Sequence, residues 1–292
     1  MSCRAAPSAP ATRSRSSTPK HLVAAPSSQV GLFGPASVSW RVDREVVVLA
    51  GGTAALLLQL AHPAVAAGVA QHSRFQEDPF ARLRRTLTAS FSVVFGTMPR
   101  AQRALERIDR VHGYVRGTVP ETGDLYDARD PQLLLWVHAT LIDTALRIYE
   151  RFVAPLSPAD AEAYHRESRE IAVRLGVPPA VAPLTLAELR GWIAERIMTG
   201  DVQVTPTARR LGQSVLYPTR LPPRWLWDAA HLPSASVLPS SIRAAYGITW
   251  NPSRERAVER LATVSRRALP MLPPALRYVP SALAAERRLR ER

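Results

Sequence analysis

Cysteine and lysine are almost absent from this chain of 292 residues. The one cysteine, Cys3, lies at the amino terminus, which excludes a disulfide framework, a cysteine-rich metal site and a thiolate-ligated haem in the folded part. This usage fits a reducing compartment, so we expect a cytoplasmic protein. The one lysine is Lys20, and every other basic residue is arginine.

Acidic residues are also scarce, with 24 Asp and Glu against 38 Lys and Arg, for a formal charge of +14. No acid precedes Asp43, and arginines crowd the last six residues, so much of the excess lies at the two ends. Basic ends can contact nucleic acid or anionic lipid. Because the arginines are not interleaved with aromatic residues and no nucleic-acid module is recognisable, we predict no specific nucleic-acid partner. Peripheral membrane contact stays open.

Residues 1–30 are rich in Ser, Ala, Pro and Arg and contain no acid. Such a segment cannot bury enough apolar surface to offset the entropy of ordering it. We therefore predict a disordered basic tail at 1–30, with an organellar targeting segment as the alternative. The remainder, 31–292, contains no flexible linker and is predicted to be one domain.

Signals for β-hairpins are lacking, and helix starts are marked repeatedly instead. At five points a residue that can cap a helix directly precedes a proline suited to its first turn: Asp78, Asp130, Ser157, Thr205 and Asn251. The sequence thus predicts an all-α fold, a single large helical bundle around a buried cofactor pocket, with proline-rich connections. We expect helices at 41–60, 63–72, 79–95, 99–117, 131–152, 158–175, 186–199, 206–216, 239–246 and 252–269, and an irregular surface segment at 217–239.

The run 46–70 has no charge and is long enough to suggest a membrane span. Gln59, His62 and Pro63 interrupt it past its midpoint. A soluble protein of this size also needs a central helix that is apolar all round. We therefore predict that this run forms the core.

His138 stands in the middle of a strongly apolar helical face. Leu134, Leu135, Leu141 and Ile142 share that face at helical spacing. A buried imidazole must be hydrogen-bonded or bound to a metal, because leaving it unpaired is costly. From the residues alone, a hydrogen-bonded core histidine is the commoner outcome and an axial haem ligand is the alternative.

Three other histidines are candidates for a pocket. His62 precedes Pro63, which has no N–H, so a hydrogen-bonding role is expected there. His112 shares a face with Leu105 and can be a core or a pocket residue. His165 follows Glu162 in a Glu-x-x-His element, but di-iron bundles need that element twice, so we exclude such a centre.

Arg82, Arg85 and Thr86 occupy one face at the start of the predicted helix 79–95. This pattern is typical of a solvated helix start. Alternatively, the arginines pair with an anion, such as a haem propionate or a substrate carboxylate, while Thr86 offers a hydroxyl inside the pocket.

Four segments carry a family likeness: 59–66 (QLAHPAVA), 78–86 (DPFARLRRT), 93–97 (VVFGT) and 134–141 (LLWVHATL). Together and in this order they resemble the family that contains the rubber oxygenase (latex-clearing protein) catalytic domain and the MpaB-type oxygenases. The likeness runs from about residue 34 to 252. It implies an all-α fold around haem b and, in the best-studied members, oxidative cleavage of an isoprenoid or similar apolar substrate by O2.

The resemblance also implies roles for individual residues. His138 matches the proximal iron ligand, and Arg82 and Thr86 match the family's Arg-x-x-Lys-Thr pattern on the other side of the haem. Arg85 replaces the lysine, and a guanidinium is not an iron ligand, so the distal position should differ here. His62 and His112 are expected to be further residues of the cofactor pocket.

The expected function is thus a haem-dependent oxygenase with Arg82, Arg85 and Thr86 on the catalytic side and His138 as the metal ligand. Its partners would be a hydrophobic small molecule, O2 and an unidentified electron donor. The alternative is a haem or lipid carrier or sensor without turnover.

Overall fold

The computed structural model describes Met1 and residues 30–73, 79–219 and 221–291; of residues 79–83 and 85 it describes the backbone alone. The predicted tail, 1–30, lies almost entirely outside these residues. The helices are α1 (Val38–Asp43), α2 (Gly52–Ala61), α3 (Pro63–His72), α4 (Pro79–Phe95), α5 (Met98–His112), α6 (Pro131–Phe152), α7 (Pro158–Arg174), α8 (Leu186–Thr199), α9 (Pro206–Leu216), α10 (Arg224–Ala230), α11 (Leu232–Val237), α12 (Ser240–Ala245), α13 (Pro252–Ala268), α14 (Pro274–Arg277) and α15 (Pro280–Arg290). Two 3-10 helices, η1 (Val46–Gly51) and η2 (Leu269–Met271), and two short strands, β1 (Arg116–Thr118) and β2 (Leu125–Asp127), complete the described chain. The predicted all-α class is confirmed.

The capped helix starts are also confirmed where they can be seen. The side chain of Asp130 accepts a hydrogen bond from the Gln132 N–H, which fixes the first turn of α6. Ser157, Thr205 and Asn251 cap α7, α9 and α13 in the same way. Asp78 lies outside the described residues.

The predicted helix 41–60 is wrong, because the chain there divides into α1, η1 and α2. The break falls at Glu45, whose backbone is extended and whose carboxylate binds Arg277. Further on, Gly51 lets η1 approach α6, since a Cβ at this position would lie 3.0 Å from Ile148 Cγ1.

Two other predictions need correction. The helix expected at 99–117 ends at His112, and residues 116–118 form β1, which pairs antiparallel with β2. The turn between the strands uses Gly123 at a φ of +81°, a conformation that favours glycine. The segment 217–239, expected to be irregular, contains the short helices α10 and α11, and α14 and α15 were not expected at all.

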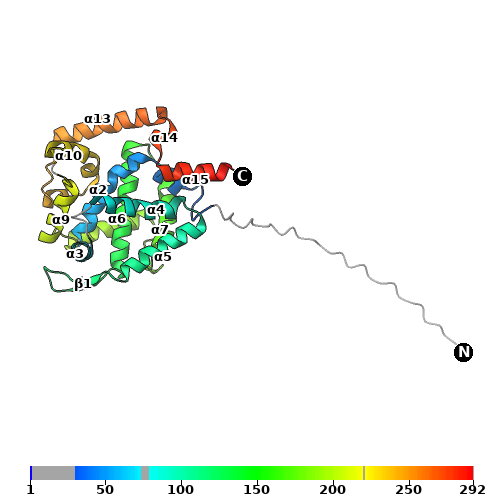
Figure 1. Cartoon of the computed structure of the whole chain (residues 1–292), viewed down its shortest axis with the longest axis horizontal. Coiled ribbons are helices and arrows are strands. Elements are labelled where there is room, and N and C mark those ends of the chain that lie inside the picture. The colour runs from blue at the N-terminus through cyan, green and yellow to red at the C-terminus, as the bar shows by residue number, and fades with distance from the viewer. Residues whose placement is uncertain (2–29, 74–78, 220, 292) are drawn as a thin grey trace.

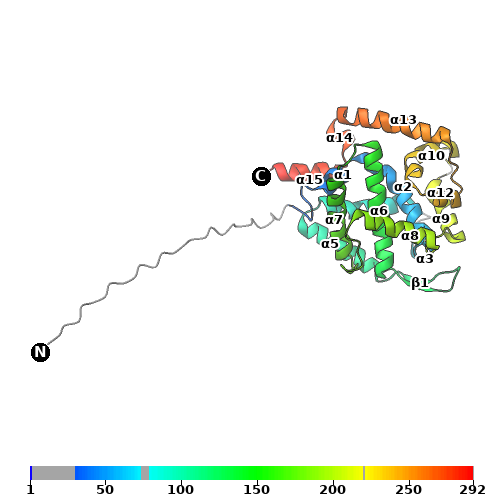
Figure 2. The same cartoon turned by 180° about the vertical axis from the view of Figure 1, so that it is seen from behind.

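Helix α6 passes through the middle of the bundle in both views (Figures 1 and 2). Helices α2, α7, α8 and α13 and the 3-10 helix η1 pack against it, and α9 and α3 lie against each other beside α2. Helix α13 runs along one edge of the molecule, opposite the β1–β2 hairpin. Trp136 of α6 anchors the core, being 1% exposed with its Nε1 donating to the Leu58 carbonyl at 3.1 Å.

The uncharged run 46–70 contributes to this core, as predicted, and Ala54, Leu57, Leu60 and Ala66 are among its buried residues. Within the described residues no single helix is both long and apolar enough to cross a membrane. The bent pair Val46–Ala61 and Pro63–His72, with 103° between its halves, meets those criteria only when the two are taken together.

Candidate functional site

His138 lies on α6 where this helix packs against α7. Its side chain is buried, and the polar groups that act on its ring, His165 and Ser168, both belong to α7. The burial expected from the apolar face around His138 is therefore confirmed. We call the α6–α7 contact around this ring the His138 site.

Burial lowers the pKa of His138 from 6.5 to about 4, the nearby His165 adds to the shift, and a hydrogen bond with the Ser168 backbone opposes it. The ring is therefore neutral at pH 7. His165 is buried as well, with its Nε2 3.1 Å from the Pro183 carbonyl oxygen, and burial also lowers its pKa. A neutral imidazole positioned by a backbone hydrogen bond is the form of histidine that binds metals.

Ser168 is itself the first of a series of hydrogen-bonded polar groups. Ser168 hydrogen-bonds with Tyr164 one helical turn earlier, and the Tyr164 hydroxyl donates to Asp43 Oδ1 at 2.8 Å. Burial raises the pKa of Asp43 from 3.8 to about 7, an effect that the hydrogen bond from Tyr164 reduces and the charge of Glu167 strengthens. Linked polar groups therefore extend from Ser168, which acts on His138, through Tyr164 to Asp43 of α1.

These polar neighbours could not be found from the sequence. Tyr164 and Ser168 are four residues apart on a predicted helix, but Asp43 is 121 residues from Tyr164 in the chain. Nothing in the local pattern joins them, because the contact forms only when α1 packs on α7.

Arg82, Arg85 and Thr86 lie on α4, as predicted, but only Thr86 has a described side chain. Thr86 is exposed, so the structure does not place its hydroxyl inside an enclosed pocket. The side chains of Arg82 and Arg85 lie outside the described part, and their roles stay predictions.

His62 is the N-cap of α3, where its Nδ1 accepts a hydrogen bond from the Ala64 N–H at 3.3 Å. The hydrogen-bonding role expected beside Pro63 is confirmed. Its ring lies 6.4 Å from that of Trp136, and burial lowers its pKa to about 4. That His62 belongs to a cofactor pocket stays a prediction.

His112 ends α5, and its buried Nδ1 has no hydrogen-bond partner among the residues that the structure describes. Burial lowers its pKa, so this atom is a neutral nitrogen available to a ligand or to water. Among the described residues, no hydrogen bond or ring contact joins His112 or His62 to His138, so the structure does not bring the three together directly.

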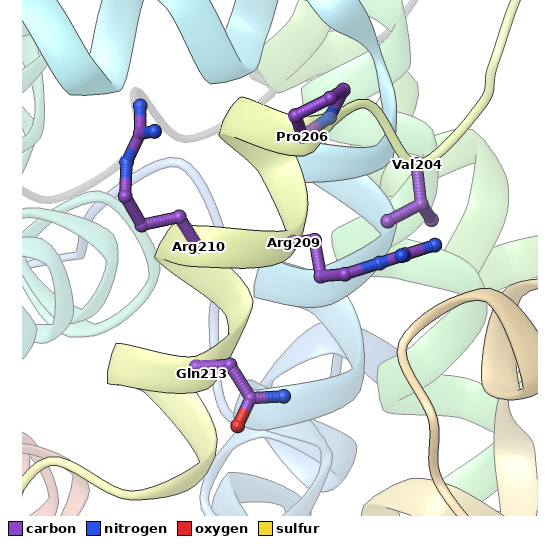
Figure 3. Close-up of a pocket in the computed structure, with 5 residues that line it drawn as sticks. All are labelled: Val204, Pro206, Arg209, Arg210 and Gln213. Carbon is purple, nitrogen blue, oxygen red and sulfur yellow. The ribbon is translucent and has the colours of Figure 1, made fainter.

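Two cavities open elsewhere in the described part of the chain. One, of about 370 Å³, is a basic depression on α9 lined by Val204, Pro206, Arg209, Arg210 and Gln213. Figure 3 shows Arg209 and Arg210 projecting from α9 in different directions. The other, of about 210 Å³, lies among α2, α10 and α11. Neither is lined by His138.

Residues 40–267 match the family described as "ER-bound oxygenase mpaB/B'/Rubber oxygenase, catalytic domain". The chain belongs to this family. It is also similar to two mycobacterial proteins, Uncharacterized protein Mb2261 of Mycobacterium bovis and Uncharacterized protein Rv2237 of Mycobacterium tuberculosis. Each is 29% identical over 230 residues, covering 75% of this chain and 87% of the relative. No solved structure matches.

Because the chain belongs to this family, the side chains at the His138 site can be compared with the ligands that a haem iron requires. In the described residues no three His, Cys, Asp or Glu side chains gather into a group that could hold a metal ion. A haem iron takes most of its ligands from the porphyrin and needs only one or two from the protein. The neutral, buried His138 meets that requirement.

Among the described residues, a buried polar atom without a partner also lies where α1 packs against α7. Ser39 of α1 is 1% exposed, its N–H donates to Glu167 Oε2 at 2.7 Å beside Ser168, and its buried Oγ has no hydrogen-bond partner in the structure. Buried polar atoms are nearly always satisfied by protein, water or ligand. The unpaired hydroxyl between α1 and α7 is therefore suited to a polar group that the chain itself does not supply.

Proposed function

We propose that this protein is a haem-dependent oxygenase that acts on a hydrophobic substrate with O2, and that His138 is the axial ligand of the iron. The observation that carries the proposal is the state of this one imidazole: buried, neutral at pH 7 and positioned from α7, in a chain of the oxygenase family. A protonated imidazole has no free nitrogen lone pair and would not serve as such a ligand.

The haem would supply the oxygen chemistry, and the chain would supply position and environment. The Ser168 backbone would hold the ring of His138 in one orientation. The apolar core around α6 would exclude water and hold an apolar substrate. Arg82 and Arg85, at the start of α4, would bind negatively charged groups such as propionates.

The test is the visible spectrum of the purified protein after expression with a haem precursor. We expect a Soret band with one haem per chain by the pyridine haemochrome assay, and its loss in His138→Ala. The matched control is His165→Ala, which removes the neighbouring buried imidazole but should keep the band. Circular dichroism and thermal unfolding would verify that both variants fold.

Oxygen uptake with terpenoids and unsaturated lipids would then separate turnover from binding. Consumption of O2 that requires His138 supports an oxygenase. A haem protein that consumes no oxygen with any of these compounds in the presence of a chemical reductant would instead be a carrier or sensor. A colourless protein that does not take up added haemin would overturn the proposal.

A further inference from the structure

The cavity of about 210 Å³ has a wall made by the proline-rich segment that follows α9. The lining comes from α2, the end of α9, α10, α11, the turn after α12 and α13: Thr53, Leu57, Leu216, Tyr217, Arg224, Asp228, His231, Ser234, Ala235, Leu238, Gly247, Ile248, Thr249 and Arg254. None of these residues acts in the proposed haem site. The oxygenase assignment therefore does not explain which ligand this cavity binds.

His231 is a fixed part of the wall. Its Nε2 lies 2.9 Å from the Leu216 carbonyl oxygen, which can only accept, so Nε2 carries the hydrogen and Nδ1 accepts from the Thr53 hydroxyl at 3.2 Å. Its ring also stacks on Trp227, with centroids 6.0 Å apart. Burial lowers the pKa of His231, so the ring is neutral and has no nitrogen to spare for a ligand.

The charged residues leave a positive excess. Asp228 accepts from the Tyr217 hydroxyl at 2.8 Å through Oδ1, and its Oδ2 lies 3.7 Å from Arg254 Nη2. Arg254 also donates to the Thr249 carbonyl at 2.7 Å. The single acid of the lining is thus engaged by Tyr217 and Arg254, and among the described residues no acid forms an ion pair with Arg224.

Both guanidinium groups retain hydrogen-bonding capacity. Arg224 lies over the Tyr217 ring at 4.2 Å and donates one hydrogen bond to Gln213 at 3.2 Å. A guanidinium has five N–H donors in a planar fork that matches a carboxylate, so each arginine can still bind an anion.

One part of the lining is apolar, and the hydroxyl-bearing residues Thr53, Ser234 and Thr249 lie in the same wall. Leu57, Leu216, Ala235 and Leu238 are all 5% exposed or less, and Ile248 completes this surface. The cavity therefore combines an apolar patch with hydroxyl groups and two guanidinium groups. Its volume lies below the range usual for drug-sized ligands, about 300–1,000 Å³.

We propose that this cavity binds a small carboxylate with a short hydrocarbon body. The carboxylate pairs with Arg224 and Arg254, and the hydrocarbon body lies against the leucines. Asp228 disfavours a second negative charge, which restricts the ligand to monoanions. The proposal is independent of haem, because its residues and those of the His138 site do not overlap.

The experiment compares hexanoate with its neutral isostere hexanamide, using calorimetry on the full chain. We expect saturable binding of hexanoate that is at least about tenfold tighter than that of hexanamide, as hydrogen bonds to a charged group are worth more than neutral ones. Arg224→Gln should weaken hexanoate binding at least about fivefold, and Arg224→Gln with Arg254→Gln should abolish the preference over hexanamide.

The matched control is Arg209→Gln, an exposed arginine of α9 that lines the other cavity, and it should leave hexanoate binding unchanged. Thermal unfolding would verify folding, and the exposed Arg224 gives a single variant with little structural risk. Equal binding of hexanoate and hexanamide, no binding of either, or unchanged affinity in a folded Arg224→Gln variant would overturn the proposal. Each result can be obtained on haem-free protein, so failure here is distinct from failure of the oxygenase proposal.

Discussion

Glu45 and Arg277 form a double ion pair across 232 residues of sequence. Arg277 Nη2 lies 2.7 Å from Glu45 Oε1, and Arg277 Nε lies 2.9 Å from Glu45 Oε2. The Glu45 side chain is 1% exposed and that of Arg277 22%. Together with the adjacent bridge from Glu45 to Tyr278, this pair attaches the segment before α15 to the start of η1.

Removing the arginine should destabilise the fold markedly. Arg277→Ala leaves a buried carboxylate without its partner, and we expect the free energy of unfolding in urea to fall by about 3 kcal/mol. The control is Arg174→Ala, which breaks the exposed pair with Glu170 and should change stability by less than about 1 kcal/mol. Similar effects of the two variants would contradict a structural role for the Glu45 pair.

Asp43 should make stability fall as pH rises. Its pKa in the folded protein is about 7 against 3.8 ordinarily, so between these values the folded state binds more protons than the unfolded state. The stabilising effect is complete below about pH 4 and is lost as the pH passes 7. Ionisation of Asp43 therefore lowers the free energy of unfolding by a few kcal/mol at most, at about 1.4 kcal/mol per pKa unit.

The variant Asp43→Asn keeps an oxygen for Tyr164 but cannot ionise. Urea unfolding at pH 5 and pH 8 should therefore show a gain in stability over the wild type that is larger at pH 8. Asp160→Asn serves as the control, because hydrogen bonds with Arg41 and Ser157 lower the pKa of Asp160 and no gain is expected there. A gain that does not grow with pH would argue against the raised pKa of Asp43.

His62 should stabilise the start of α3 only when neutral. Its pKa in the folded protein is about 4 against 6.5 ordinarily, so its contribution is complete above pH 6.5 and is lost as the pH falls towards 4. His62→Ala should cost about 1 kcal/mol at pH 7.5, through loss of the cap to Ala64, and less at pH 4.5. His62→Asn, which restores a capping acceptor, should recover stability at pH 7.5; equal losses in both variants would count against the cap.

Replacing two helical glycines by alanine should change the stability of the fold in opposite directions. A Cβ at Gly212 would lie 2.5 Å from Tyr246 Cε1 and 3.2 Å from Leu57 Cδ2, so Gly212→Ala should lower stability by about 1–3 kcal/mol. A Cβ at Gly191, on the exposed side of α8, meets nothing within 4 Å. Gly191→Ala should raise stability by up to about 1 kcal/mol, and thermal unfolding of both variants would show whether the packing at Gly212 is as close as described.

Sequence reasoning succeeded where the cause is local. The starts of α6, α7, α9 and α13 follow from a capping side chain directly before a proline, and the burial of His138 follows from the spacing of leucines on one helix. It failed at 41–60, because the helix is interrupted by a contact of Glu45 with a residue near the other end of the chain. It also missed α15, where a charged, arginine-rich segment becomes helical against α4.

The amino-acid order by itself determined the helical class, most helix boundaries, the family and the burial of the imidazole that we propose as the iron ligand. Only the tertiary structure decided which polar groups meet at the helix contacts: Ser168 and His165 of α7 act on that imidazole, and Ser39 and Asp43 of α1 bind α7. The difference has one physical reason. Capping and amphipathic spacing act over a few residues, whereas the neutrality of His138, the raised pKa of Asp43 and the unpaired Ser39 hydroxyl come from burial between helices that are distant in sequence.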